Sequence, residues 1–302
     1  MKRKISFGTW CFQFTPYDKK PVGLDDVLKG AASLGYDGVS LDGNHANPET
    51  FPTQQARKEL ARNISGYGLG VSEFNPKFGV VGGVVIQFQP DTWVEAIKES
   101  LQFVDDCGFT KTVRVDTRAA PCFMVESDYK RAWDTTVYAF KKAANAARSY
   151  GLQLVWEFEP GFLFNTPDEV VKMWRDVNEP NFLFELDSSH VYIISELGLL
   201  QQTKKQTLPG GQLELIEMCK DKVGLVHLID NDGTLYEGIT SMHRPFGKGN
   251  INFDRVMPAL RDSARYKGDW WVIDVVFNDD AWTVLKDAKK FVDVLNDKYG
   301  DY

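Results

Sequence analysis

Hydrophobic residues recur along the chain in eight short segments that are separated by longer stretches of helical period. The short segments are rich in β-branched, aromatic and aliphatic residues, as buried parallel strands are. They cover residues 4–12, 38–42, 68–75, 111–116, 152–159, 182–187, 223–230 and 270–277. The stretches between them repeat apolar residues every three or four positions, and several end at a glycine, which favours a helix end there. The pattern predicts a strand followed by a helix, eight times over.

This alternation predicts an α/β protein, a single (β/α)₈ TIM barrel that occupies residues 1–302 as one domain. Successive strands begin about 38 residues apart on average, a comfortable length for one βα unit. A doubly wound open sheet is the alternative. Such a sheet usually carries a glycine-rich phosphate-binding turn after an early strand, and this sequence has none.

Polar residues gather where the predicted strands end. His45, His190 and His227 lie at or just beyond the ends of the second, sixth and seventh strands, and His243 lies in the loop after the seventh. Catalytic side chains of βα barrels sit at the carboxyl ends of the strands. The acidic residues that come late in strands are Asp42, Glu73, Asp116, Glu157, Glu159, Asp187, Asp230 and Asp274. We therefore expect a site built from carboxylates and imidazoles at this end of the barrel.

Carboxylates that converge on one barrel mouth repel one another unless a cation neutralises them. One residue from each of the last four strands gives the set Glu157, Asp187, His227 and Asp274. Three carboxylates and one imidazole suit a single divalent metal ion, with Mn²⁺ as the first choice and Mg²⁺, Co²⁺ or Zn²⁺ as alternatives. A buried salt bridge or a strand-end cap is the other interpretation of each residue taken alone.

Composition and charge argue against some classes of binding partner. The chain is 43% hydrophobic and 25% charged, enough apolar material for a large core. It has 35 Lys and Arg against 42 Asp and Glu, and the resulting net charge of −7 predicts neither nucleic acid nor a membrane as a partner. The four cysteines form no C-x-x-C pair, and neither a signal-peptide pattern nor an apolar run long enough to span a membrane is present. These features predict a cytoplasmic protein.

Four motifs follow one another at the predicted strand ends. They are Trp156-Glu-Phe-Glu-Pro-Gly, Leu186-Asp-Ser-Ser-His190, His227-Leu-Ile-Asp230 and Arg244-Pro-Phe-Gly-Lys-Gly-Asn-Ile-Asn-Phe253. Together they resemble the xylose-isomerase-like barrel superfamily, which includes sugar isomerases, ketose 3-epimerases, inosose dehydratases and the barrel subunits of C-glycoside deglycosidases. The resemblance implies that Glu157, Asp187 and His227 are metal ligands and that His190 hydrogen-bonds substrate hydroxyls. Epimerases of the superfamily usually carry glutamate on the last strand, where this chain has Asp274.

The residues and the resemblance together predict a divalent-metal-dependent sugar isomerase or epimerase. It would abstract a proton next to a carbonyl and pass through an enediolate. A metal-dependent lyase on sugar derivatives is the alternative, either a C-glycoside deglycosidase acting on 3-oxo-glycosides or an inosose-dehydratase-like enzyme; a non-enzymatic sugar-binding barrel is the competing class. The candidate catalytic residues are Glu157, Glu159, His190 and Asp274. The candidate substrate-binding residues are His45, His190, His243, Arg244, Trp10 and Phe277.

Two questions stay open at this point. Period-two alternation puts Glu157 and Glu159 on one face of their strand, and the sequence does not decide which is the ligand and which the base. The apolar residues 80–86 fit either a subunit contact or a local hydrophobic plug. The expected partners are a small sugar or glycoside substrate and further protein chains, as a homo-oligomer or, for a C-deglycosidase, as a hetero-oligomer with a small subunit.

Overall fold

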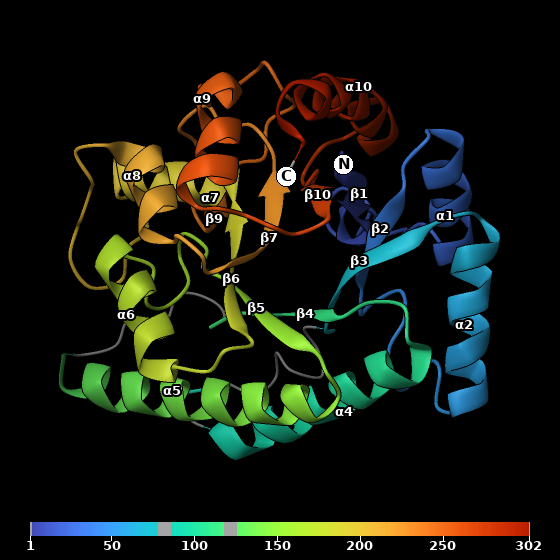
Figure 1. Ribbon diagram of the computed structural model, residues 1–302, viewed down its shortest axis with the longest axis horizontal. Coiled ribbons are helices and arrows are strands. Elements are labelled where there is room, and N and C mark those ends of the chain that lie inside the picture. The colour runs from blue at the N-terminus through green and yellow to red at the C-terminus, as the bar shows by residue number, and fades with distance from the viewer. Residues whose placement is uncertain (1, 78–85, 88, 118–125, 302) are drawn as a thin grey trace.

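Eight parallel strands close into a barrel in the computed structural model, which describes residues 2–77, 86–87, 89–117 and 126–301 (Figure 1). Strands that follow one another in the chain are neighbours, and the first pairs with the last. The strands are β1 (Lys4–Gly8), β2 (Gly38–Asp42), β3 (Gly70–Asn75), β4 (Thr112–Val115), β5 (Gln153–Glu157), β6 (Phe182–Asp187), β7 (Val223–Leu228) and β10 (Trp270–Ile273). The predicted (β/α)₈ fold is confirmed, and the open-sheet alternative is excluded.

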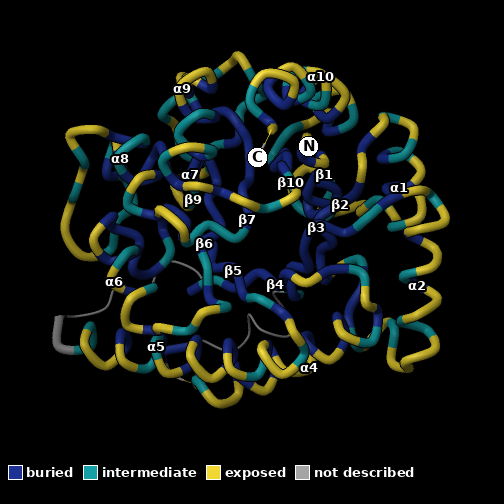
Figure 2. The backbone as a smooth tube through the Cα atoms, in the orientation of Figure 1, coloured by how far each residue is buried: buried dark blue, intermediate teal, exposed yellow. Residues whose placement is uncertain are grey.

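Helices surround the barrel and bury the outer faces of its strands. In Figure 2 the strands at the centre are buried, while the helices alternate buried and exposed positions along their length. The helices are α1 (Leu24–Ser33), α2 (Gln54–Gly66), α4 (Pro90–Cys107), α5 (Glu126–Ser149), α6 (Pro167–Val177), α7 (Ser188–Tyr192), α8 (Gly211–Met218), α9 (Phe253–Pro258) and α10 (Ala281–Tyr299). Short elements extend several loops: the 3₁₀ turn η1 (Thr9–Phe12), the π-helical turns η2 (Ile193–Leu197) and η3 (Ala259–Ser263), and the hairpin strands β8 (Leu235–Tyr236) and β9 (Thr240–Ser241).

Several strands end earlier than their hydrophobic pattern predicts. The first ends at Gly8 and continues as η1, the fifth ends at Glu157, and the eighth ends at Ile273. The predicted bounds were wrong here because residues beyond each strand stay apolar and buried while the chain already turns into its βα loop. Glu159 therefore lies in a loop, two residues past its strand.

The inside of the barrel is apolar at one end and polar at the other. Val155, Leu225 and Val272 form a small apolar layer inside the barrel, with Leu183 and Trp270 packed against it. The large apolar core lies between the barrel and the helices and contains many of the aromatic residues found near strand ends, including Phe12, Phe74, Phe158 and Phe164. Packing is thus the role of these four rings.

Glycines end four helices as the sequence predicts. Gly35, Gly68, Gly108 and Gly151 all adopt a positive φ, between 66° and 76°, a conformation that a side chain disfavours. Gly268 is required by close packing instead, since an added Cβ would lie 2.3 Å from the hydroxyl oxygen of Tyr266.

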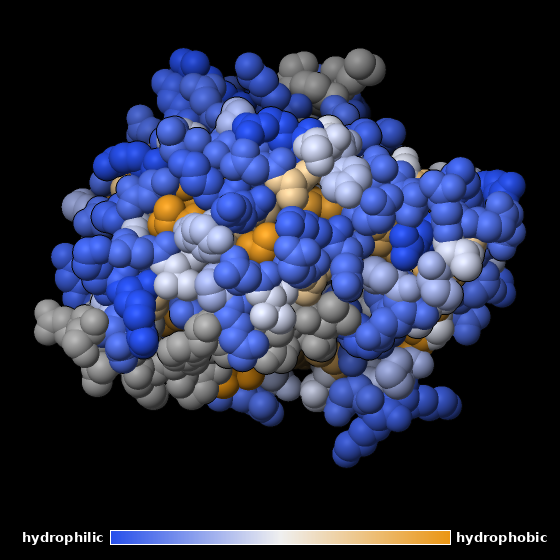
Figure 3. All heavy atoms as spheres, turned by 90° about the horizontal axis from the view of Figure 1, so that it is seen from below, coloured by the Kyte–Doolittle hydropathy of each residue, from blue (hydrophilic) through white to orange (hydrophobic). Residues whose placement is uncertain are grey.

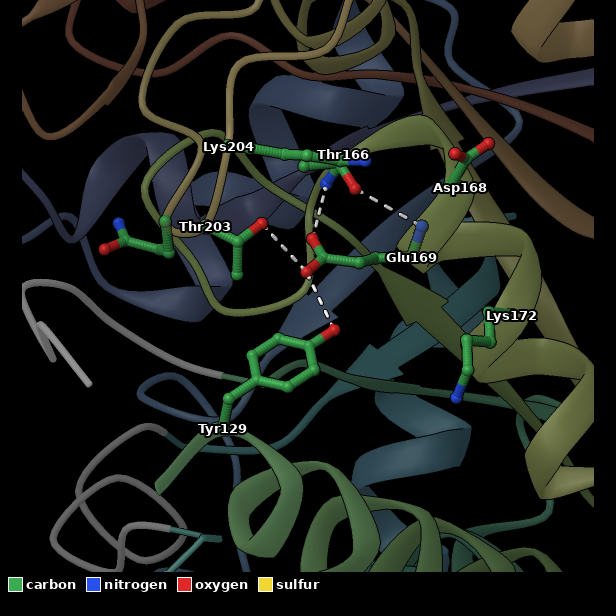
Figure 4. A pocket seen from close by; sticks show the side chains of 8 residues that line it. Tyr129, Thr166, Asp168, Glu169, Lys172, Thr203 and Lys204 are labelled. Atoms are coloured by element: carbon green, nitrogen blue, oxygen red, sulfur yellow. Dashed lines mark hydrogen bonds between the residues drawn. The ribbon is translucent and has the colours of Figure 1, made fainter. Parts of the chain in front are cut away.

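Helix α6 begins with a capping box formed by Thr166 and Glu169, a T-x-x-E pattern of the kind that starts helices. The Thr166 hydroxyl accepts from the Glu169 amide, and the Glu169 carboxylate accepts from the Thr166 amide. Figure 4 shows the second oxygen of Glu169 accepting hydrogen bonds from the hydroxyls of Tyr129 and Thr203. These residues line a pocket between α5, α6 and the loop at residues 202–204, and none of its lining residues belongs to the predicted site.

Thr166→Ala is expected to lower the free energy of unfolding by about 1 kcal/mol, because the Glu169 amide loses its acceptor. Urea unfolding followed by circular dichroism measures the change. Thr92→Ala, an exposed threonine in the first turn of α4, is the control and should change stability by less than about 0.5 kcal/mol. Equal effects of the two substitutions would contradict the role of the cap.

The surface is mainly hydrophilic on the face that Figure 3 shows, with hydrophobic residues visible only in small separate places. Among the described residues, no helix is long and apolar enough to cross a membrane. The apolar segment proposed as a plug or a subunit contact lies almost entirely outside the described residues; Ile86, at its end, is buried.

Candidate active site

Four buried side chains at the carboxyl end of the barrel bring one polar atom each to a common point. They are Glu157 of β5, Asp187 of β6, His227 of β7 and Asp274, which directly follows β10. Their nearest oxygen or nitrogen atoms all lie within 4.8 Å of one another, and each residue is at most 4% exposed. The structure thus assembles the set that the sequence predicts. Their role as metal ligands stays a prediction.

Neighbouring groups hold the other oxygen of Glu157 and of Asp187. Arg114 of β4 forms an ion pair with Glu157 Oε2, while Glu157 Oε1 faces His227 Nδ1 at 3.3 Å. Asp187 Oδ1 accepts from the amides of Ser189 and His190 at 2.8 and 2.9 Å and so caps α7. Each carboxylate therefore presents one oxygen to the common point while the other fixes its orientation.

His227 and Asp274 are held in the same way. His227 Nε2 lies 2.8 Å from Glu73 Oε1, which accepts a hydrogen bond from its N–H, and 3.1 Å from Glu185 Oε1. Nδ1, on the opposite side of the ring, is left to face the other three residues. The indole N–H of Trp10 donates to Asp274 Oδ1 at 2.7 Å, and the same indole stacks on the His227 ring with centroids 5.5 Å apart.

The arrangement fits a divalent cation. Within the part of the chain that the structure describes, Glu157 Oε1, Asp187 Oδ2 and His227 Nδ1 are buried and have no hydrogen-bond partner. Unpartnered buried acceptors are costly, and a cation is the ligand that oxygen and imidazole donors of this kind share. The neighbours that hold the other atom of each side chain are of the kind that orient metal ligands in proteins.

Glu159 and two histidines supply groups that could move protons beside this cluster. His190 Nε2 lies 3.7 Å from both Glu157 Oε1 and Glu159 Oε2, and His190 and His243 have ring centroids 5.4 Å apart. Burial and the charge of Glu157 raise the pKa of Glu159 well above its usual value. Burial lowers the pKa of His190 to about 3. Burial also lowers that of His243, but the charge of Asp274 outweighs it and raises the pKa to about 9.

The structure adds Arg114 and Glu185 to the site, two residues that the strand-end pattern did not indicate. Arg114 pairs with Glu157 and with Glu159, the latter at 2.7 Å, and Glu185 and Glu73 flank His227. Charged residues inside apolar strands, as in Thr112-Val-Arg-Val and Phe182-Leu-Phe-Glu-Leu-Asp, were the available signal. The prediction missed this signal because it rested only on residues at strand ends.

Other predicted residues lie elsewhere. His45 Nε2 is held by the carbonyl of Val22 at 3.0 Å and by Gln13, and His45 belongs to none of the acid and histidine groups at the mouth. Arg244 pairs with Asp232 in the loop after β7, and Phe277 stacks flat on Tyr236 at 3.7 Å. Their substrate contacts stay predictions.

Two of the late acidic residues stabilise loops. Asp42 accepts from the Asn44 amide, and Asp230 accepts from the amides of Gly247, Gly249 and Ile251. Neither belongs to a group of acids and histidines able to hold a metal.

Trp10→Phe should lower the affinity for Mn²⁺ about tenfold, because Asp274 loses the donor that orients it while the stacked ring is kept. Isothermal titration of metal-free protein measures the affinity. Trp133→Phe is the matched control, since the Trp133 indole donates to Asp176 on the outer helices at 2.8 Å. Unchanged affinity in Trp10→Phe would show that this bond does not orient a ligand.

The closed barrel with a buried cluster of acids and histidines at its mouth defines the chain as a TIM-barrel protein. The family described as xylose isomerase-like TIM barrel matches residues 28–290, and the chain belongs to this family. Inosose dehydratase of Geobacillus kaustophilus is 23% identical over 300 residues, which cover 90% of this chain and 87% of that protein. The IolI protein with a bound zinc atom superposes with a TM-score of 0.71 at 17% identity, over 99% of this chain and 100% of that one. L-ribulose 3-epimerase also gives 0.71, at 18% identity, over 99% and 96%.

Proposed function

We propose that the protein is a divalent-metal-dependent isomerase or epimerase of sugars or sugar derivatives, acting by proton abstraction next to a carbonyl. One observation carries the proposal: four residues from four consecutive barrel strands turn one polar atom each to a common buried point, while neighbours orient them. The similarity to a zinc-bound barrel protein and to a ketose epimerase supports both the metal and the substrate class.

Glu157, Asp187, His227 and Asp274 would hold the metal. When bound, a divalent ion polarises a substrate carbonyl and stabilises the negative charge that develops on its oxygen. Mn²⁺ is the first choice for this donor set, with Mg²⁺, Co²⁺ and Zn²⁺ as alternatives.

Of the two glutamates of the fifth strand segment, Glu159 is the proposed proton acceptor and Glu157 the proposed metal ligand. Glu157 belongs to the four-residue cluster, whereas Glu159 lies beside it and is held by Arg114 and by the Thr240 hydroxyl at 3.1 Å. Its raised pKa makes this carboxylate a stronger base than one in water. His190 and His243 line the same space and would contact substrate hydroxyls.

A lyase is the second candidate, and one observation favours it. Epimerisation needs a second group to return a proton to the opposite face of the carbon, and Asp274 is tied by Trp10 and lies 3.6 Å from His243. An enzyme with one free carboxylate can instead expel a β-substituent. The similarity to inosose dehydratase over nearly the whole chain agrees with this outcome.

Incubation with Mn²⁺ in D₂O tests both candidates on three substrate sets: free ketoses and aldoses, 3-oxo-glucosides, and inososes. Deuterium at C3 of a ketose or C2 of an aldose supports the isomerase or epimerase. Release of an aglycone or of water without such exchange supports the lyase. Metal binding without exchange or cleavage in any set would overturn the enzymatic proposal in favour of a sugar-binding protein.

A further inference from the structure

A small hairpin in the loop after β7 reaches two of the proton-handling groups. Its strands β8 and β9 pair Leu235 with Ser241 and Tyr236 with Thr240. Thr240 contacts Glu159, and Ser241 lies against His190 with its hydroxyl oxygen 2.7 Å from the imidazole Nδ1. The end of the hairpin packs closely against the loop after β5. An added Cβ at Gly161 would lie only 2.3 Å from the Ile239 carbonyl oxygen.

The hydrogen bonds around Ser241 begin at Asn231, whose amide orientation is set by the backbone. Its Oδ1 accepts from the Gly233 amide at 2.6 Å, and its Nδ2 donates to the Met242 carbonyl at 2.6 Å. An amide NH₂ group can only donate hydrogen bonds. Nδ2 therefore also donates to Ser189 Oγ at 2.8 Å. Asn231, Ser189, Ser241 and His190 are all at most 3% exposed, so water does not compete along this chain of bonds.

The direction of the next two bonds follows. Ser189 Oγ, already an acceptor, donates its own proton to Ser241 Oγ at 2.8 Å. Its other acceptor, the Met242 carbonyl, is 3.4 Å away and is already bonded to Asn231. Ser241 therefore directs its proton to His190 Nδ1. A neutral imidazole that accepts at Nδ1 carries its proton on Nε2.

We propose that Ser241 is a positioning residue that fixes His190 as the Nε2–H tautomer, so that His190 donates a hydrogen bond to a substrate oxygen. Nε2 faces the space beside Glu157 and Glu159, at 3.7 Å from each. His243 is oriented the other way, since its Nδ1 donates to the Asp274 carbonyl at 3.0 Å. Its buried Nε2 has no hydrogen-bond partner among the described residues. The tautomer rests on geometry alone, whereas the substrate contact rests on the proposed function.

The tautomer is measured on the metal-free protein by ¹⁵N NMR of its histidines, of which there are only four. The His190 signals are assigned by their loss in His190→Gln. We expect a protonated Nε2 and an unprotonated Nδ1 in the unmodified protein, and a mixture of tautomers in Ser241→Ala. A protonated Nδ1 in the unmodified protein, or an unchanged tautomer in Ser241→Ala, would overturn the proposal.

Ser195→Ala is the matched control, because Ser195 of η2 is equally buried but donates to the carbonyl of Val191, four residues earlier in α7. It should leave the His190 signals unchanged. Ser241→Thr keeps the hydroxyl and should restore the single tautomer that Ser241→Ala loses.

Turnover provides a second measurement on whichever substrate the exchange assay identifies. Ser241→Ala should lower kcat/KM about tenfold, as expected for one misoriented hydrogen bond, and Ser241→Thr should recover most of it. Absence of turnover in the unmodified protein would count against the proposed function, while the NMR result would still decide the tautomer. Full kcat/KM in Ser241→Ala would overturn the role of this orientation in the reaction.

Discussion

Asp187→Asn is expected to remove bound metal from the protein. The amide oxygen of asparagine can still accept from the Ser189 and His190 amides, so the cap of α7 is kept. The other atom becomes an NH₂ group, which cannot ligate a cation. Loss of a direct ligand should weaken Mn²⁺ binding by more than about 100-fold, beyond the effect of an outer-shell change. Metal content after dialysis and titration calorimetry measure the loss.

Asp230→Asn is the control for this substitution. Asp230 is also a buried aspartate just past a strand, but its oxygens accept from loop amides and it lies outside the four-residue cluster. It should keep about one metal ion per chain. Stoichiometric metal in Asp187→Asn would remove Asp187 from the ligand set, and equal losses in both variants would point to general damage to the barrel mouth.

Glu159→Gln is expected to slow turnover by about 10² to 10⁴-fold, the usual contribution of a general base. Glutamine keeps the shape, and its Oε1 can still accept from Arg114. Its NH₂ group then faces the Thr240 hydroxyl, which can accept a hydrogen bond instead of donating one, but the amide cannot take a proton. Because Glu159 is not in the four-residue cluster, metal content should stay unchanged. Deuterium exchange at the substrate carbon is the direct measurement, since it reports proton abstraction itself.

Two further variants separate the possible roles. Glu157→Gln should lose metal and activity together. Glu169→Gln alters a buried glutamate of the capping box and should leave exchange within about twofold of the unmodified rate. Normal exchange in Glu159→Gln would show that another group is the base.

The four-residue cluster could be predicted from the sequence because barrel geometry supplies the missing information. In a parallel barrel the carboxyl ends of successive strands meet at one mouth, so acids and histidines at strand ends are brought together whatever the helices do. Glu157, Asp187 and His227 end or nearly end their strands, and Asp274 follows its strand directly. The capping box at Thr166 was equally predictable, because it depends on four consecutive residues.

The groups that orient the cluster could not be predicted, because each depends on contacts between distant segments. Trp10 reaches Asp274 across the seam of the barrel, and Gly8 leaves room for its ring, since an added Cβ would lie 2.2 Å from it. Arg114 and Glu185 are interior residues of strands whose pattern looks merely apolar. Ser241 contacts His190 only because the hairpin of β8 and β9 brings the loop after β7 back to the mouth.

Because β1 pairs with β10, the complete site can form only after the barrel has closed. Trp10 follows the first strand and Asp274 follows the last, 264 positions along the chain, so their contact exists only after the ring has closed. Contacts at such separations form late, because the loop they close must first lose its conformational entropy. Until its final strand is inserted, the chain lacks Asp274, the fourth residue of the cluster, at the mouth. The complete site therefore distinguishes a closed barrel from any partly folded one.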